Sequence, residues 1–328
     1  MKLSVRQGWA AGTKLSCCMK KHPASQDVSP AAGCASGIFL SVAVRVKSAA
    51  VWTLLLILGA AVCFPVLLLV SGSVTGEYEM AWRLLPMAAG KSPEEGGFVT
   101  WGLLPEFPEF TGFAKLLFAT PQFFTLFWNS VGMTAATLLG ELAVAVPAAW
   151  AFAAYRFPMR KGLFTVYIVL MLLPFQVLML PQYLVLHGLR LLDTRWAVIL
   201  PGIFAAFPVF VIYRSFSEIP ESLLEAARID GAGEWRCLCQ VGLPLAQAGV
   251  AAAFVLQFLE CWNLIEQPLA FLKDQTLWPL SLYLPRIGVG QAGFAMAASV
   301  VALLPALCVF AFGQEYLEQG ISASGIKG

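Results

Sequence analysis

The sequence has little charge, few histidines and no CxxC cysteine pair. Asp, Glu, Lys and Arg make up 12% of its 328 residues, whereas soluble domains carry about 25% charged residues. Apolar residues make up 59%, and the mean hydropathy is +0.76. This composition argues against a soluble globular domain or a disordered chain and indicates a polytopic membrane protein. The formal net charge of +2 is too small to indicate a nucleic-acid partner.

Catalytic and metal-binding motifs are also absent. The two histidines, His22 and His187, are far apart, and the eight cysteines include no CxxC pair. Because several cysteines lie in apolar runs, we expect small buried hydrophobic side chains rather than a disulfide framework or a metal site. The sequence contains no GxSxG, HExxH or GxxxxGKS/T motif. Without the last of these, the chain has no phosphate loop of its own with which to bind ATP.

Six long apolar runs predict an all-α membrane protein with six transmembrane helices. A run of ~20 residues, rising 1.5 Å per residue in a helix, matches the ~30 Å hydrocarbon core of a bilayer. The runs cover residues 51–70, 126–154, 163–186, 196–213, 248–272 and 293–312. Pro174 and Pro181 punctuate the third run, and a polar tail follows the sixth run from residue 313.

The first 47 residues differ in composition from the rest. Residues 1–50 hold seven Lys or Arg residues and one acidic residue, with no compact apolar stretch behind the first charges. This pattern is not typical of a cleaved signal peptide. We expect residues 1–47 to be a disordered basic tail, or to lie upstream of the natural start; a functional basic arm is the alternative. Residues 48–328 are expected to form the transmembrane domain, with a charged insert at 214–246.

The distribution of basic residues predicts the orientation in the membrane. Six spans place both termini on one side. The segments on that side hold 14 Lys and Arg residues, and the opposite loops hold 7. Without residues 1–44 the counts are 9 and 7. Because cytoplasmic loops are enriched in Lys and Arg, we expect a multi-pass protein of the cell membrane with both termini and the insert in the cytoplasm.

The insert at 214–246 has the pattern of two short helices. Residues 222–228 suit a helix capped by Ser222, and Gly231 supplies a stop that favours positive φ. Residues 236–241 suit a second helix that ends before Pro244. From spacing alone, the insert is a surface hairpin that joins two spans. Small alanines on a short helix would also suit docking into a groove of another protein.

The insert resembles the EAA loop of ABC transporter permeases, in which the pattern EAAxxDGA is followed by a Leu-Pro pair. The matching residues are Glu225, Ala226, Ala227, Asp230, Gly231, Ala232, Leu243 and Pro244. Further motifs resemble the carbohydrate-uptake, maltose MalG-like branch: Asn129-Ser130, the turn at 188–194, Trp262-Asn263 and the C-terminal residues 325–328. The similarity covers about residues 110–328. Ala248 stands where the family usually has a proline, and residues 237–239 replace a bulky aromatic.

The resemblance implies a transport subunit of type I importer architecture, not an enzyme. In such permeases the EAA loop forms a coupling helix that docks on a separate ATPase dimer, which uses ATP and Mg. By this resemblance Glu225, Ala226, Ala227 and Gly231 would carry the docking, and Asp230 would shape the turn. The resemblance also implies alternating access, a second homologous permease and an extracytoplasmic solute-binding protein that delivers a carbohydrate. This chain itself would bind no cofactor or metal.

The end of the chain also resembles the family terminus, which can reach the ATPase. The residues concerned are Gln314, Tyr316, Gly320, Lys327 and Gly328. A solvated tail without a partner is the alternative interpretation.

Polar residues in and near the fifth run are candidates for a substrate path. Four of them fall within about 120° of one face if the run is a single helix. Polar groups at this depth are costly and are functional by default. The candidates are Gln176, Gln257, Glu260, Trp262, Asn263 and Gln267. Amides and carboxylates can hydrogen-bond sugar hydroxyls, and the Trp262 ring can stack on a sugar face. Polar contact with the partner permease is the alternative.

Two other acidic residues lie in apolar runs. We expect Glu141 to form an inter-helix hydrogen bond and Glu266, near the outer end, to reach water. A rival function is an ion-coupled secondary transporter that uses Glu141 or Glu260 as its proton or sodium site. Such a carrier would need no ATPase dock. A structural membrane protein without transport activity is a second rival.

Overall fold

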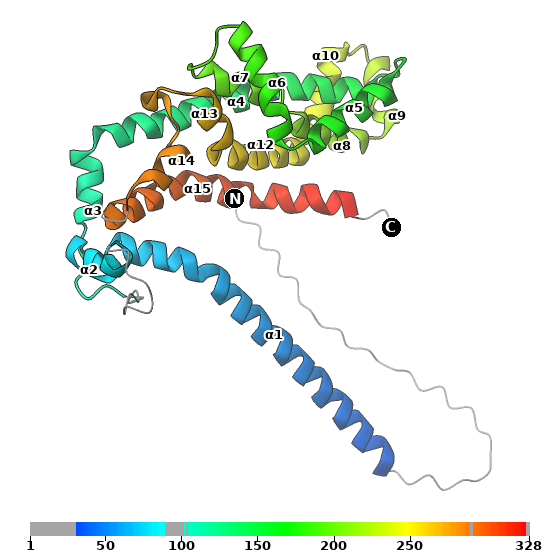
Figure 1. Ribbon diagram of the computed structural model, residues 1–328. Coiled ribbons are helices and arrows are strands. Elements are labelled where there is room, and N and C mark those ends of the chain that lie inside the picture. Colours follow the sequence, from blue (N-terminus) through cyan, green and yellow to red (C-terminus); the bar gives the residue numbers. More distant parts are fainter. Residues whose placement is uncertain (1–30, 89–101, 103, 289–290, 326–328) are drawn as a thin grey trace, which may run out of the picture. The chain divides into compact units, whose positions relative to one another are not determined.

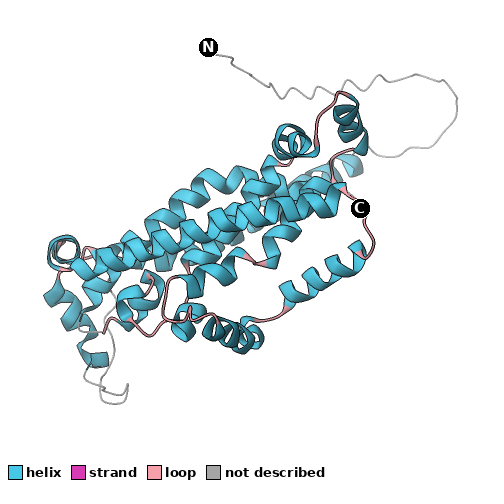
Figure 2. Cartoon of the chain, turned by 90° about the horizontal axis from the view of Figure 1, so that it is seen from above, coloured by secondary structure: helices cyan, strands magenta, loops and turns pink. Residues whose placement is uncertain are grey.

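A computed structural model describes residues 31–88, 102, 104–288 and 291–325. This part of the chain consists of helices and loops, as Figure 2 shows, and contains no β-sheet. One isolated bridge joins Thr75 and Pro108. The expected all-α fold is therefore confirmed.

The chain divides into two units, residues 1–62 and 63–328. Helix α1 (Ala31–Ser73) passes from one unit into the other. The expected first span lies inside α1, but the helix already begins at Ala31 and runs through the boundary expected at residue 47. The tail predicted for residues 1–47 therefore includes helical residues, and its first 30 residues lie outside the described part.

Four straight helical segments are long and apolar enough to cross a membrane. They are Val51–Ser73 within α1, Pro121–Ala154, Trp196–Ser217 and Ala292–Glu318. The second is helix α4 (Pro121–Ala154). The third joins α7 (Trp196–Ile203) to α8 (Ala206–Ser217). The fourth belongs to α15 (Ala292–Gly325). Two bent helix pairs raise the number of candidate spans to six, which agrees with the six predicted runs.

The third expected span is broken rather than straight. Helix α5 (Arg160–Leu172) and helix α6 (Phe175–Gly188) meet at an angle of 105°. Leu173 has φ −73° and ψ 127°, an extended conformation. The cause is Pro174, because proline disfavours a helical conformation in the residue before it and has no N–H to continue the helix.

The fifth span is shorter than its sequence predicts. Helix α12 (Gln247–Trp262) ends ten residues before the expected end at residue 272, and a separate helix, α13 (Glu266–Phe271), follows. A continuous helix is disfavoured here because the ring of Pro268 would clash with the carbonyl four residues earlier. At its other end, α12 bends by 77° from the helical stretch Glu234–Leu245.

The sixth span is longer than predicted, because α15 continues as a helix to Gly325 where a polar tail was expected. The remaining elements outside the insert are α2 (Glu77–Ala88), α3 (Thr111–Ala114), η2 (Lys115–Ala119), η4 (Gln275–Leu277), α14 (Leu280–Tyr283) and η5 (Leu284–Arg286).

Helix α4 is the central element of the 63–328 unit. It packs against α7, α8 and α12, and α12 in turn packs against α15 (Figure 1). Two buried apolar clusters lie along α4. The first includes Leu126 and Met133, and the second includes Ala145, Ala149 and Trp150. The two clusters are separated by about three helical turns of α4.

The N-terminal half of α4 holds the segment 273–286 through its backbone. The Asn129 amide donates hydrogen bonds to the carbonyls of Thr276 and Trp278 at 2.6 and 3.3 Å. The hydroxyl of Ser130 accepts a hydrogen bond from the Leu280 N–H at 2.7 Å. Asn129 and Ser130 are both buried. This segment is therefore fixed to α4 by three hydrogen bonds, of which those at Trp278 and Leu280 are buried.

Candidate functional site

The insert at 214–246, here called the EAA segment, forms four short helical elements. They are α9 (Glu221–Ile229), α10 (Glu234–Arg236), η3 (Cys237–Gly242) and α11 (Leu243–Leu245). Gly231 has φ +82°, so the predicted left-handed stop after the first helix is confirmed. Two details of the prediction are wrong. Pro220, not Ser222, is the N-cap of α9, and helical structure continues past Pro244, which lies in the first turn of α11.

The motif residues of the EAA segment lie mostly at its surface. Glu225, Ala226, Asp230, Gly231 and Pro244 are exposed. The three other motif residues are half-buried, namely Ala227, Ala232 and Leu243.

Of the large apolar side chains in the EAA segment, Ile229 and Trp235 are the most exposed. Ile229 is 85% exposed and Trp235 is 69% exposed. The sequence analysis did not single out either residue. Ile229 directly precedes the Asp-Gly turn and Trp235 follows it by four residues, and this position beside a surface turn could have indicated their exposure. With the exposed Ala226, these side chains give the EAA segment an apolar surface next to acidic residues.

The opposite side of the EAA segment is packed into the second apolar cluster. Leu224, Cys237 and Leu238 are buried in that cluster together with Trp150 of α4. A Cβ atom on Gly242 would lie 2.5 Å from the Trp150 ring, so only glycine permits this close approach. The residues that replace the family's aromatic are therefore partly core residues, which fix the EAA segment on α4.

A polar cluster joins the two halves of the EAA segment to the end of α4. Arg228 and Glu234 form an ion pair at 3.0 Å across the Gly231 turn. The hydroxyl of Tyr155 donates a hydrogen bond to Glu234 Oε2 at 3.0 Å. The Arg228 hydrogen bond lowers the pKa of Glu234, and the same bond raises the pKa of Arg228. Burial, followed by the bond to Glu234, raises the pKa of Tyr155. At neutral pH Glu234 and Arg228 are therefore both charged, and their ion pair holds the turn. Tyr155 stays neutral and donates its hydroxyl hydrogen.

A second ion pair joins the same two elements. Arg156, which follows α4, lies 3.0 Å from Glu221 at the start of α9, and both side chains are exposed. The EAA segment is thus attached to the C-terminal end of α4 by one buried apolar contact region and two polar contacts.

A cavity of about 860 Å³ lies among α4, α5, α6, α7, α8, α12 and α13. Three of the predicted path residues line it: Gln257, Glu260 and Gln267. They do not form a stripe on one helix, because α12 ends at Trp262 and Gln267 comes from α13. The turn between the two helices nevertheless brings Gln267 to the same cavity. We call this space the membrane cavity.

The other three predicted path residues do not line the membrane cavity. Trp262 is 7% exposed, and its indole N–H donates to the carbonyl of Ala302 at 3.0 Å. Asn263 is exposed and donates to the carbonyl of Leu259 in its own helix at 2.9 Å. In this structure the Trp262 ring is thus core, packed on Phe127 and Phe258, rather than a free stacking surface.

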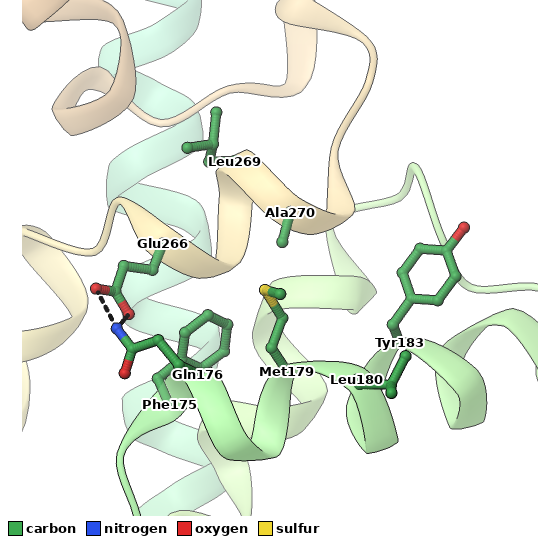
Figure 3. A pocket seen from close by; sticks show the side chains of 8 residues that line it. All are labelled: Phe175, Gln176, Met179, Leu180, Tyr183, Glu266, Leu269 and Ala270. Atoms are coloured by element: carbon green, nitrogen blue, oxygen red, sulfur yellow. Dashed lines mark hydrogen bonds between the residues drawn. The ribbon is translucent and has the colours of Figure 1, made fainter.

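Gln176 lines a different, mainly apolar pocket of about 550 Å³. Its amide donates to Glu266 Oε1 at 3.0 Å, and Figure 3 shows this bond joining α6 to α13. Glu266 is exposed, as expected, but it also has this partner. The pair therefore positions α6 against α13 and does not contribute to the membrane cavity.

Sequence reasoning missed several residues of the membrane cavity. Thr134 and Thr137 of α4, Gln182 of α6 and Cys261 of α12 all line it. The sequence could have indicated the two threonines, because they are small polar residues three positions apart and therefore lie on one helix face. Gln182 was not, because only the bend at Pro174 turns α6 toward the cavity.

Glu141 is buried, with 2% of its surface exposed, one turn beyond Thr137 on the same face of α4. Its Oε1 atom has no hydrogen-bond partner within the described residues. The inter-helix hydrogen bond expected for Glu141 is therefore not found for this atom.

The remaining candidates are placed only in part. Gln314 and Tyr316 are exposed on α15, and Gly320 lies within the same helix. Lys327 and Gly328 lie outside the described residues. Cys237 is buried as expected, whereas Cys63, Cys239 and Cys308 are exposed. In the described ranges, no three His, Cys, Asp or Glu side chains gather in a way that could hold a metal ion.

The helix arrangement matches a known fold. It is similar to a chain in a crystal structure of a bacterial ABC transporter involved in the import of the acidic polysaccharide alginate. The match has a TM-score of 0.69, covers 83% of this chain and 96% of that chain, and has 24% sequence identity. At this identity the likeness concerns the fold alone.

The family model of the binding-protein-dependent transport system inner membrane component matches residues 143–323, and the chain belongs to this family. It is 32% identical to the arabinooligosaccharides transport system permease protein AraQ of Halalkalibacterium halodurans, over 63% of this chain and 75% of that protein. It is 31% identical to the sn-glycerol-3-phosphate transport system permease protein UgpE of Brucella abortus, over 60% and 71%. The chain is therefore a permease, a transport component rather than an enzyme, and nothing in these likenesses favours an ion-coupled carrier.

Proposed function

We propose that this chain is the permease subunit of a carbohydrate importer that is powered by a separate ATPase. The observation that carries the proposal is the exposed surface of the EAA segment. Glu225, Ala226 and Ile229 on α9, with Trp235 beyond the turn, present apolar and acidic groups that the described part of the chain leaves uncovered. Exposed apolar patches rimmed by polar groups are typical of sites that bind another protein.

The proposed partner of the EAA segment is the ATPase dimer. It binds ATP and Mg, whereas this chain carries no phosphate loop. Gly231 and Asp230 form the turn that sets the angle of α9, and Ala227, Ala232, Leu243 and Pro244 complete the motif. The end of the chain is proposed to contact the same ATPase. The residues concerned are Gln314, Tyr316, Gly320, Lys327 and Gly328.

The other proposed partners follow from the family. A second homologous permease completes the translocation path, and an extracytoplasmic solute-binding protein delivers the solute. The chain is proposed to lie in the cell membrane with both termini in the cytoplasm, because the Lys and Arg count favours that side for the EAA segment. A carbohydrate is favoured because the relative AraQ is named for arabinooligosaccharides.

The mechanism that we propose is alternating access driven through α4. Closure of the ATPase dimer displaces the EAA segment, which is attached to Trp150 and Tyr155 at one end of α4. The same helix carries Thr134 and Thr137 of the membrane cavity. A shift of the EAA segment therefore has a direct mechanical route to the cavity wall. The free-energy difference between the two openings must be supplied by the ATPase, since the permease binds no nucleotide.

The experiment compares the wild-type complex with two variants of the EAA segment. The chain is co-expressed with its neighbouring permease, ATPase and binding protein, and reconstituted into liposomes. Glu225→Lys reverses a charge on the exposed face, and Gly231→Asp places a side chain where φ is +82°. We expect both variants to lose ATP hydrolysis stimulated by the solute-loaded binding protein. Loss of ATPase co-purification would identify this surface as the dock itself.

Glu218→Lys is the matched control. Glu218 is an exposed carboxylate at the end of α8 with only a 3.8 Å contact to Arg214, and it belongs to the EAA segment but not to its motif or to the surface formed by Glu225, Ala226, Ile229 and Trp235. It should retain the stimulated ATP hydrolysis. Full stimulation in both EAA variants would refute the coupling role. Solute uptake that continues without any ATPase would instead support an ion-coupled carrier, and Glu141→Gln and Glu260→Gln would then identify its ion site.

A further inference from the structure

The membrane cavity contains hydrogen-bond acceptors that the protein does not satisfy. The Oε1 atoms of Gln182 and Gln267 are buried and have no hydrogen-bond partner within the described residues. Both residues line the cavity, one from α6 and one from α13. Buried polar atoms are rarely left unpaired in folded proteins. In this conformation the two oxygen atoms are covered, so a molecule in the cavity can donate to them only when the amide groups turn toward it.

A second observation concerns the charge of the cavity wall. Glu260 is its one carboxylate, and no Lys, Arg or His is found among the described residues that line it. The other polar groups are neutral, among them the amide of Gln257, whose nitrogen donates weakly to Cys261 Sγ at 3.7 Å. An anion placed here would meet a carboxylate and no compensating cation.

The apolar part of the wall is aromatic as well as aliphatic. Tyr167, Phe175 and Phe207 line the cavity from α5, α6 and α8. Aromatic faces suit the C–H faces of a sugar ring, while the amides suit its hydroxyl groups. The cavity volume of about 860 Å³ lies within the roughly 300–1,000 Å³ of typical small-molecule sites.

We propose that the membrane cavity is a solute site within this chain and that it selects neutral, hydroxyl-rich solutes over anionic ones. Gln182 and Gln267 accept hydrogen bonds from solute hydroxyls, and Glu260 accepts one while repelling negative charge. This inference rests on the proposed carbohydrate transport and sharpens it. By this proposal the chain does not transport anionic solutes such as sn-glycerol 3-phosphate or an acidic polysaccharide, because these would require a cation in the cavity wall.

The charge of the cavity can be measured at Cys261, next to Glu260, without any transport assay. The purified full-length complex is treated with a cationic (2-aminoethyl) or an anionic (2-sulfonatoethyl) methanethiosulfonate, and modification of Cys261 is followed by peptide mass spectrometry. The two reagents are first calibrated on a free thiol. Beyond that calibration, we expect the cationic reagent to react about tenfold faster with Cys261, because of the adjacent carboxylate.

Glu260→Gln should remove most of this preference. Glu315→Gln, an exposed carboxylate on α15 outside the cavity, should leave it unchanged. Equal rates for both reagents in the wild-type chain would overturn the proposal.

Uptake measurements test the amides. Gln267→Ala and Gln182→Ala should each raise the KM for uptake of an arabinooligosaccharide about tenfold, whereas Gln122→Ala, exposed on α4 and outside the cavity, should not. In all these variants sn-glycerol 3-phosphate should remain a poor substrate. ATP-dependent uptake that is unaffected by both cavity variants overturns the site and leaves the proposed function intact. Uptake that needs no ATP overturns the proposed function, and the Cys261 reaction still decides the charge preference.

Discussion

The two ends of helix α4 hold neighbouring segments in different ways. At one end, Asn129 and Ser130 are buried and bind the backbone of the segment 273–286. At the other end, Tyr155 and Arg156 bind side chains of the EAA segment, and the Arg156 pair is exposed to solvent. One end of α4 thus binds backbone groups of the segment 273–286, and the other end binds side chains of the EAA segment.

This difference indicates which of the two neighbouring segments can be displaced from α4 at the lower cost in polar contacts. A buried hydrogen bond that is broken leaves unpaired groups away from water, whereas an exposed ion pair contributes only about 0–1 kcal/mol because water replaces each partner. Displacement of the EAA segment therefore costs little in polar contacts. If the segment 273–286 left α4, the carbonyls of Thr276 and Trp278 would lose their donor and the Leu280 N–H would lose its acceptor. The contrast agrees with a protein in which force enters at the EAA segment and the opposite end stays fixed.

The largest effect is expected from Asn129→Ala. This change removes two donated bonds and leaves the Arg195 guanidinium, which donates to Asn129 Oδ1 at 2.8 Å, without its acceptor. We expect a loss of about 2–3 kcal/mol in stability, since the buried Trp278 carbonyl is left without its donor. Thermal and denaturant unfolding in detergent would measure it. Asn263→Ala is the control, because Asn263 is exposed and bonds only to its own helix; an equal loss in both variants would contradict the comparison.

A smaller effect on stability is expected from Tyr155→Phe at the other end of α4. The variant loses the 3.0 Å bond to Glu234 but should lose less than about 1 kcal/mol in stability, because this cluster reaches solvent. Solute-stimulated ATP hydrolysis should fall about threefold, as one bond of the route to α4 is lost. Tyr213→Phe in α8, where the Tyr213 ring packs on Phe164 of α5, should change neither quantity. A large loss of stability with normal stimulation would reverse the roles assigned to the two ends.

The smallest effect is expected from the pH dependence of Asp193. Its carboxylate accepts the N–H groups of Asp274 and Lys273, each at 2.8 Å, and these bonds lower its pKa. A lowered folded pKa means that the contribution is present above the ordinary carboxyl pKa and is lost only as the pH falls through the lowered value. Corrected for intrinsic exchange rates, the amide protection of residues 273 and 274 should not change between pH 7 and about 5.

Asp193→Asn should lower that protection severalfold already at pH 7, since the charge that strengthens both bonds is gone. Protection that titrates between pH 7 and 5 in the wild-type chain would show that another group holds this turn.

The sequence predicted the class of fold and most of the helical spans, because apolar runs and helix length are local properties. It also predicted the left-handed turn at Gly231. It could not predict the bend angle at Pro174 or the early end of α12, which depend on how neighbouring helices cover the freed backbone groups. Three of the six predicted path residues line the membrane cavity. Trp262 does not, because its indole N–H meets a carbonyl of α15, a contact 40 residues away in the chain.

The break between α5 and α6 has a consequence for biosynthesis. Each half, of 13 and 14 residues, is shorter than the ~20 residues needed to cross a bilayer. Residues 163–186 are nevertheless free of charged side chains, so the insertion machinery meets one continuous hydrophobic stretch. We expect the stretch to enter the membrane as a unit and to bend only where neighbouring helices shield the peptide groups at Leu173 and Pro174. The shape of the cavity wall would then be acquired during helix assembly.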